Sequence, residues 1–251
     1  MPTWIQAWFW GLVAGGALVV GAAIAYLAPV PRRIVAGIMA FGGGVLISAL
    51  AFELMEEAYE WGGLPATAIG FLSGATMFTA ANWFLSRTGA KHRKRSEGKQ
   101  PSEADHPGSG VALAVGALLD GVPESMVIGV SMIGGGVVSA VTVLAVFLSN
   151  VPEGLSSAAG MKEAGRSARY IFGVWVGIAV ISSIAALIGY AMVGRLAPEW
   201  IAAITAFAAG AILAMLADTM IPEAFEETHN FTGLITVIGF LSAFVLSRAL
   251  E

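Results

Sequence analysis

Long apolar stretches, separated by short polar connections, run through nearly the whole chain. A helix that crosses a bilayer needs about 20 mainly apolar residues, and eight stretches meet this length, at 4–27, 34–57, 64–85, 111–132, 137–159, 170–193, 200–221 and 233–250. The first stretch lacks a basic leader region and begins with Trp4, Trp8 and Trp10, so we interpret it as a helix rather than a signal peptide. The pattern predicts an all-α membrane protein with eight transmembrane helices in a single domain, residues 1–251.

Composition supports this fold class. Of the 251 residues 57% are hydrophobic and 12% are charged, with a mean hydropathy of +0.80, whereas soluble domains have about 25% charged residues. We therefore expect the lipid bilayer, and no nucleic acid, as the partner of this chain. Gly70 and Gly74, and likewise Gly173 and Gly177, have the four-residue spacing that allows close helix packing in membranes. The chain has no cysteine, so a bound metal would have nitrogen or oxygen ligands.

The basic residues predict the orientation, because cytoplasmic loops of membrane proteins are enriched in Lys and Arg. Three predicted loops on one side carry eleven of the 13 basic residues: Arg32, Arg33, Arg87, Lys91, Arg93, Lys94, Arg95, Lys99, Lys162, Arg166 and Arg169. The other side has Arg195 and Arg248. We expect these three loops to be cytoplasmic, both termini to be extracytoplasmic, and the protein to lie in the cell (plasma) membrane.

The longest of these loops, at about 86–109, is polar and basic. It has too little apolar surface to fold alone, so we expect a flexible cytoplasmic loop. His92 and His106 lie in it and could capture a metal, but histidines in a solvated linker are more often ordinary linker residues.

Two of the predicted helices resemble each other in sequence. When 34–57 is laid on 200–221, one constant offset matches Gly44, Leu46, Leu50, Glu57 and Ala58 with Gly210, Ile212, Leu216, Glu223 and Ala224. The two helices would cross the membrane in opposite directions. This predicts an inverted repeat in a 3+2+3 arrangement, which in transporters places the substrate site between the related halves.

Carboxylates in the middle of two apolar helices are the main chemical signal. The fourth predicted helix contains Asp120-Gly-Val-Pro-Glu124-Ser125, and the fifth contains Ser149-Asn150-Val-Pro-Glu153-Gly154. A charge at this depth costs about 2.5–3.5 kcal/mol on insertion scales. The spacings place Asp120 with Glu124, and Asn150 with Glu153, on one face of each helix.

The prolines add backbone acceptors to this site. Pro123 and Pro152 have no N–H to donate to the carbonyls of Leu119 and Leu148, and such freed groups are tolerated where they line a cavity. Because 111–159 contains no Lys, Arg or His, a bound cation is the simplest compensation for the acids. The alternatives are protonated acids and hydrogen bonds between helices, and for Ser149 and Asn150 alone we favour hydrogen bonding between helices.

These two segments resemble the His-Asn-x-Pro-Glu-Gly type motif of the ZIP family of divalent-metal transporters. Pro123 and Glu124 match it on the fourth helix, and Asn150, Pro152, Glu153 and Gly154 on the fifth. From the residues themselves we expect metal ligands at Asp120, Glu124, Ser149, Asn150 and Glu153. The resemblance further implies a homodimer and an elevator-like motion of helices one, four, five and six against the rest.

The chain also departs from the family pattern. Asp120 and Gly121 replace the His-Asn pair, Ser125 replaces a glycine, and 170–193 has no carboxylate for a second metal. We therefore expect one oxygen-rich site. Oxygen ligands suit Mn, Mg or Ca, whereas the family favours Zn, Fe or Mn.

Further acids lie near the ends of the repeated helices. Glu53 and Glu57 are close to the predicted outer end of 34–57, and Asp218 and Glu223 are in the inner part of 200–221. Pro222-Glu223-Ala224 also resembles a family segment. We expect these four to be relay positions for metal on its way in and out, with ordinary interfacial carboxylates as the alternative.

The sequence thus predicts a transporter that moves a divalent metal into the cytoplasm by alternating access, with no cofactor beyond the transported ion. A proton- or sodium-coupled carrier, a metal sensor and an inactive homologue are the alternatives. His-Glu-x-x-His and Gly-x-Gly-Asp motifs are absent, and no nucleophile is paired with a histidine base, so we do not expect an enzyme.

Overall fold

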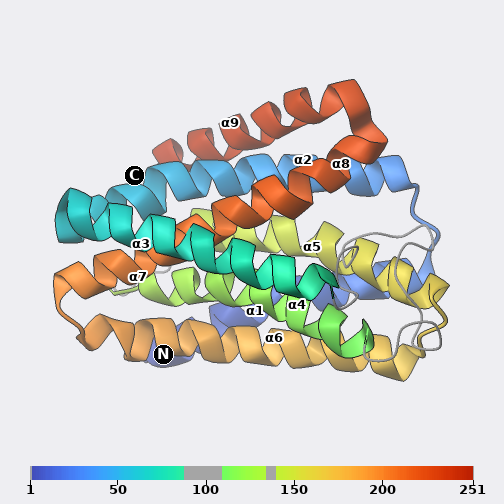
Figure 1. The fold of residues 1–251 in the computed structure, drawn as a ribbon, viewed down its shortest axis with the longest axis horizontal. Coiled ribbons are helices and arrows are strands. Elements are labelled where there is room, and N and C mark those ends of the chain that lie inside the picture. Colours follow the sequence, from blue (N-terminus) through green and yellow to red (C-terminus); the bar gives the residue numbers. More distant parts are fainter. Residues whose placement is uncertain (1, 88–108, 134–139, 251) are drawn as a thin grey trace.

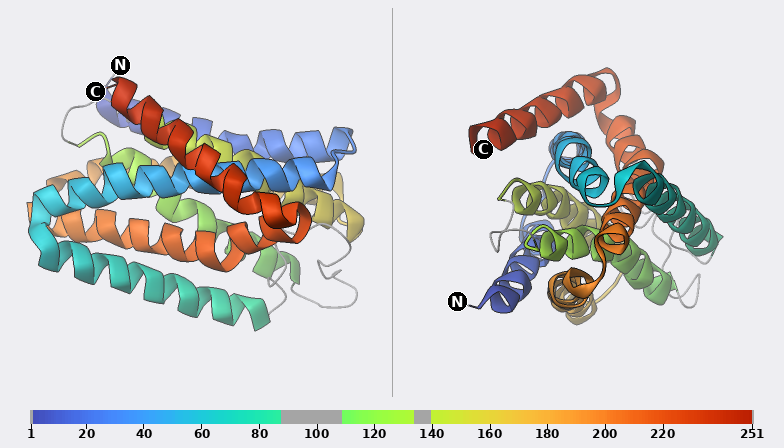
Figure 2. Two further views of the ribbon diagram at one scale, coloured as in Figure 1. Left: turned by 90° about the horizontal axis from the view of Figure 1, so that it is seen from above. Right: turned by 90° about the vertical axis from the view of Figure 1, so that its left-hand side faces the viewer.

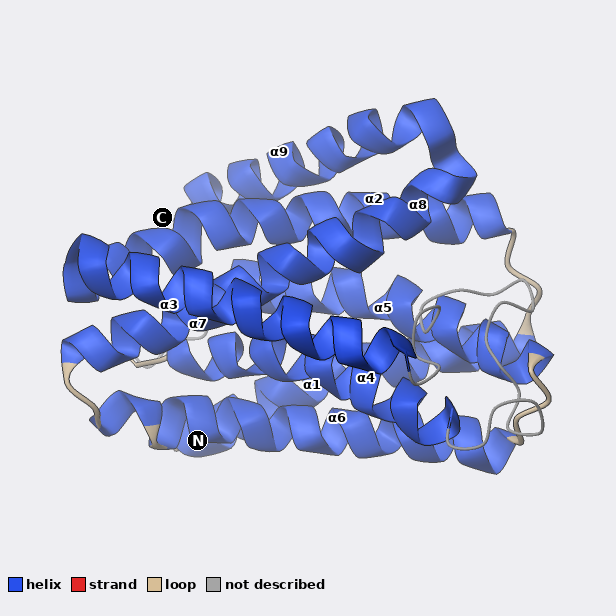
Figure 3. Cartoon of the chain, viewed as in Figure 1, coloured by secondary structure: helices blue, strands red, loops and turns tan. Residues whose placement is uncertain are grey.

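The computed structural model describes residues 2–87, 109–133 and 140–250, and this part of the chain is helical without a strand (Figures 1 and 3). Its elements are α1 (Thr3–Leu27), α2 (Arg32–Ala49), the π-helical η1 (Leu50–Leu54), α3 (Met55–Leu85), α4 (Ser109–Val130), α5 (Ala140–Glu163), α6 (Ala168–Ala191), η3 (Val193–Arg195), α7 (Pro198–Met215), the π-helical η4 (Leu216–Met220), α8 (Ile221–Thr228), η5 (His229–Phe231) and α9 (Thr232–Leu250). The predicted all-α fold class is confirmed.

Several helices are long and apolar enough to cross a bilayer. In the described residues there are five such stretches, Thr3–Leu27, Arg32–Leu85, Val111–Val130, Ala168–Arg195 and Pro198–Ala249. They indicate a membrane-embedded protein. Helix α5 is not among them; it carries the polar Ser149, Asn150 and Glu153 in its middle.

The two longest stretches each reverse direction at a sharp break, as Figures 1 and 2 show. In the first, α3 is interrupted at Gly63, whose φ of 64° and ψ of −177° suit glycine because it has no Cβ. In the second, the chain turns at His229, with φ 44° and ψ −118°. Each stretch therefore contains two of the helices that the sequence predicts.

The helices form two groups, which we call the α1 group (α1, α4, α5 and α6) and the α2 group (α2, α3, α7, α8 and α9). Within the α1 group, α1 packs on α5 and α6, and α4 packs on α6; within the α2 group, α3 packs on α7, and α2 on α8 and α9. Glycines bring backbones together inside each group: a methyl group on Gly154 of α5 would overlap the carbonyl of Leu18 in α1. The groups meet mainly where α2 faces α5 and α4 faces α7.

Helices α2 and α7 share an unusual local structure at the offset found in the sequence. The π-helical segment Leu50–Leu54 follows α2, and Leu216–Met220 follows α7 in the same register. The two helices run in opposite directions along the bundle in Figure 1. These observations support the predicted relation between 34–57 and 200–221.

The packing of the two helices is also reciprocal. A methyl group on Gly44 of α2 would overlap the carbonyl of Thr236 in α9, and one on Gly210 of α7 would overlap the carbonyl of Phe71 in α3. The pair α2 and α9 is therefore packed like the pair α7 and α3.

The two pairs of glycines with four-residue spacing differ in how they pack against other helices. Gly70 and Gly74 lie against the backbone carbonyls of Ala203 and Phe207 in α7, as predicted. For Gly173 and Gly177 the prediction of close packing is wrong within the described residues, because no atom of another helix there lies within 4 Å of a Cβ built on either residue. Spacing alone does not say which face of a helix meets a neighbour.

The described connections that carry basic residues, and that we predict to be cytoplasmic, lie at one end of the bundle. Figure 1 shows the α1–α2 and α5–α6 connections together at that end, and the α6–α7 connection at the opposite end. Arg32 of α2 is 4.0 Å from Glu163 of α5 there. His92, His106 and nearly all of the predicted loop lie outside the described residues.

Candidate functional site

The polar side chains predicted as ligands are all buried in α4 and α5. Relative exposure is 2% for Asp120, 1% for Glu124, 0% for Ser149, 2% for Asn150 and 4% for Glu153. Glu124 lies four residues after Asp120, and Glu153 four residues after Ser149, so each helix presents its pair on one face. The site is therefore an interior one, not a patch on the outside of the bundle.

Asn150 connects α5 to α1. Its Nδ2 donates a hydrogen bond of 2.9 Å to the carbonyl oxygen of Ala14. Because that carbonyl only accepts, the bond fixes which side-chain atom is Oδ1. Oδ1 is buried and has no hydrogen-bond partner within the described residues. Asn150 thus joins two helices, the role we favoured for it, and also offers an acceptor to the interior.

Pro152 of α5 leaves a backbone carbonyl without its usual helical hydrogen bond, and this carbonyl faces the α2 group. Pro152 lies inside α5 and has no N–H for the carbonyl of Leu148. That carbonyl oxygen would be 3.1 Å from a Cβ built on Gly42, so it faces the backbone of α2. The hydroxyls of Ser149 and Ser125 donate to the carbonyls of Val146 and Gly121 in their own helices, at 2.9 and 2.8 Å.

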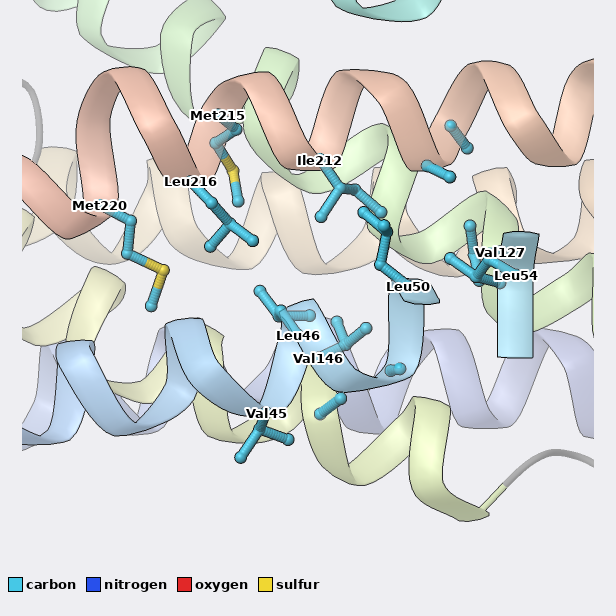
Figure 4. Close-up of a cluster of buried hydrophobic side chains, with 14 of the residues drawn as sticks. Val45, Leu46, Leu50, Leu54, Val127, Val146, Ile212, Met215, Leu216 and Met220 are labelled. Atoms are coloured by element: carbon cyan, nitrogen blue, oxygen red, sulfur yellow. The ribbon is translucent and has the colours of Figure 1, made fainter. Parts of the chain in front are cut away.

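Glu124 lines a small cavity between the two groups. The cavity has a volume of about 10 Å³ open to the centre of a water-sized sphere, which is roughly the room that one water needs. Leu46, Leu50, Leu54, Val127, Val146 and Ile212, labelled in Figure 4, form most of its apolar wall. Ala49, Thr142 and Ala145 complete the lining. A carboxyl group thus borders a small cavity whose lining is otherwise almost entirely apolar.

Glu53 holds a position next to this cavity. It lies in the π-helical η1 and is half-buried. Thr142 of α5 donates a hydrogen bond of 2.8 Å to its Oε2, and Ser247 of α9 donates one of 3.3 Å to its Oε1. Three elements therefore meet at one carboxylate.

The sequence did not identify Thr142 or Ser247. Thr142 lies seven residues before Ser149 and eleven before Glu153, which places it on the same face of α5, and this periodicity was the available signal. Ser247 lies far along the chain from Glu53, and no local pattern connects the two.

The other predicted relay residues have different environments. Glu57 follows Glu53 by four residues and is half-buried. Asp218, in the π-helical η4, is exposed, whereas Glu223 in α8 is half-buried. The four relay residues thus lie on the two repeated segments, and one of them, Glu53, is hydrogen-bonded to Thr142 of α5.

In the described part of the chain, the acids of α4 and α5 are not gathered into a group of three. Among residues 2–87, 109–133 and 140–250, no three Asp, Glu, His or Cys side chains lie close enough together to hold a metal ion. What the site offers instead is oxygen: carboxylates, the Asn150 amide, serine hydroxyls and the carbonyl of Leu148. Such a set suits hard cations better than soft ones.

Comparison with known proteins gives no further guide to the site. No protein-family model matches the chain, and no curated protein matches it.

Proposed function

We propose that this protein transports a divalent metal cation into the cytoplasm by alternating access, through an oxygen-rich site on α4 and α5. The burial of Asp120, Glu124 and Glu153 in the interior of a membrane-embedded bundle is the observation that carries the proposal. Intramembrane acids are costly and commonly mark an ion pathway. The resemblance of the two Pro-Glu segments to the ZIP family gives the substrate class.

The arrangement of the helices supports alternating access. The sequence resemblance implies that α1, α4, α5 and α6 move as one body in an eight-span, 3+2+3 inverted repeat. The α1 group has these members, and its glycine contacts hold its backbones together. Its contact with the α2 group includes the larger Leu, Val and Ile side chains around the cavity of Glu124. Such side chains repack more readily than touching backbones. A homodimer is part of the same proposal.

The ion is of the Zn, Fe or Mn class by family resemblance, with Mn, Mg and Ca favoured by the ligands. Asp120 replaces histidine, so that no imidazole is available on α4 or α5 between residues 111 and 159. The surplus of carboxylates over the two charges of the ion would allow proton exchange during the cycle.

Metal uptake and metal binding test this function together. Purified protein would be titrated with Zn, Mn, Fe, Mg and Ca in competition, and uptake of the same ions would be measured in proteoliposomes. We expect Glu124→Ala and Glu153→Ala to lower uptake at least tenfold and to weaken binding. Glu124→Gln, which keeps the side-chain shape, separates loss of charge from poor folding. Glu199→Ala, an exposed acid in the first turn of α7, is the matched control.

The alternatives give different results. Intact uptake and binding in both alanine variants would overturn the site. Transport that depends on protons or sodium and continues without a divalent ion would indicate a coupled carrier. Tight binding without flux would indicate a sensor or an inactive homologue.

A further inference from the structure

Thr142 occupies a special place between two acidic groups. It lines the cavity that Glu124 also lines, and its Oγ1 donates a hydrogen bond of 2.8 Å to Oε2 of Glu53. Its side chain is 2% exposed. Thr142 therefore lies between the buried Glu124, whose cavity it lines, and Glu53, to which its hydroxyl is hydrogen-bonded.

The hydrogen bond of Thr142 joins the two groups of helices. Thr142 belongs to α5 in the α1 group, whereas Glu53 belongs to η1 in the α2 group. Ser247 of α9 donates to the other oxygen of Glu53 at 3.3 Å, and this bond lies within the α2 group. Ser247 thus orients the carboxylate, and Thr142 attaches the α1 group to it.

A series of residues forms the proposed path from Glu60 to Glu124, and burial increases along this series. Glu60 is exposed, Glu57 and Glu53 are half-buried, and Thr142 and Glu124 are buried. Glu53, in the middle of this series, belongs to the π-helical segment Leu50–Leu54. π-Helical turns inside α-helices are frequent at functional sites.

We propose that Thr142 is the gate residue of this path: its bond to Glu53 keeps the path to Glu124 closed in the structure, and breaking it opens the path. This inference rests on the proposed transport function. A cation that reaches Glu53 neutralises the carboxylate and competes with the hydroxyl for its oxygen. Thr142 is then released, its oxygen becomes a ligand on the way to Glu124, and no covalent bond changes.

Thiol labelling in the absence of metal tests the gate. The chain has no cysteine, so Ala49→Cys introduces the only thiol, on the cavity wall formed by α2. The rate of reaction with a charged maleimide would be measured on the purified full chain in nanodiscs, where both faces are accessible. In this background Thr142→Val removes the hydroxyl at nearly constant shape, and Thr142→Ser keeps it.

We expect Thr142→Val to label about tenfold faster, because a hydrogen bond to a charged acceptor is lost from the closed state only. Thr142→Ser should label at the original rate, and Ser247→Ala should fall between. Ala197→Cys, in the exposed α6–α7 connection, is the control and should label equally fast in every variant.

An unchanged rate in Thr142→Val, or an equal increase in Thr142→Ser, would overturn the gate. Failure of the proposed function is visible separately, because it is measured as metal uptake and binding. A Thr142→Val effect on labelling would support the gate even if Glu124→Ala left uptake intact.

Discussion

At the scale of single residues, the two ends of the Asn150 amide differ in their surroundings, and different substitutions can test each end separately. Its Nδ2 ties α5 to α1, and its buried Oδ1 faces no hydrogen-bond partner among the described residues. A buried amide with one bonded and one open end fits a ligand that also fixes its own helix. The orientation of the Asn150 side chain on α5 would then depend on its hydrogen bond to α1, although α1 has no charged residue of its own.

Replacing Asn150 should affect stability and binding differently. Asn150→Leu removes both polar ends, so we expect the free energy of unfolding to fall by about 1–3 kcal/mol and metal affinity to fall as well. Asn150→Asp removes the donor to Ala14 but keeps an oxygen, so we expect lower stability with metal affinity retained. Thermal unfolding and metal titration in detergent measure the two effects. Unchanged affinity in Asn150→Leu would show that Oδ1 is not a ligand.

The sequence identified the residues whose type is unusual for their location, and missed those whose role depends on a distant partner. Glu124 and Glu153 are conspicuous as acids in apolar helices, and both are buried. Thr142 is an ordinary residue in an apolar helix until Glu53 is placed beside it. That contact arises from the packing of α5 against α2, whose chain continues into η1, and local spacing does not determine this packing.

At the scale of elements, the repeated packing of α2 and α7 depends on two glycines at equivalent positions. Gly44 and Gly210 each lie directly against a backbone carbonyl of a neighbouring helix, in α9 and α3 respectively. Close approach of backbones is the usual basis of helix association in membranes, where apolar burial gives little preference for protein over lipid. These two contacts therefore bring α2 close to α9, and α7 close to α3.

Alanine substitutions test this packing. Gly44→Ala and Gly210→Ala each introduce a methyl group that overlaps a carbonyl, and overpacking costs about 1–3 kcal/mol. Gly173→Ala is the matched control because no other helix of the described residues comes within 4 Å of its Cβ position, and its helix should gain up to about 1 kcal/mol. We expect lower melting temperatures for the first two variants only. Equal behaviour of all three would contradict the reciprocal packing.

The contrast between the glycine pairs explains what the sequence leaves open at this scale. Gly70 with Gly74 and Gly173 with Gly177 have the same spacing, yet only the first pair packs on a neighbouring helix. In a membrane protein both the buried face and the lipid face of a helix are apolar. Hydrophobic periodicity therefore predicts the extent of each helix well, and its rotation poorly.

At the scale of the whole molecule, the two reversals inside the long apolar stretches lie at opposite ends of the bundle, and only one of these ends carries the basic connections. The reversal of the chain within α3, which contains Gly63, lies at the end of the bundle that carries the α6–α7 connection. The turn from α8 to α9, which contains His229, lies at the end with the basic α1–α2 and α5–α6 connections (Figure 1). If the two long apolar stretches each cross the membrane twice, these reversals lie on opposite sides of it. The predicted orientation then makes the Gly63 side extracytoplasmic.

Single cysteines at the two reversals test the number of crossings and the orientation in one experiment. Glu60→Cys and Asn230→Cys replace exposed residues beside these turns, in a chain without other cysteines. A membrane-impermeant maleimide should label Glu60→Cys in intact cells, and Asn230→Cys only after the membrane is permeabilised. The physical reason is the retention of Lys- and Arg-rich connections on the cytoplasmic side. Labelling of both cysteines from one side would contradict the double crossing. If Asn230→Cys were labelled in intact cells and Glu60→Cys only after permeabilisation, the proposed path from Glu53 to Glu124 would start on the cytoplasmic side.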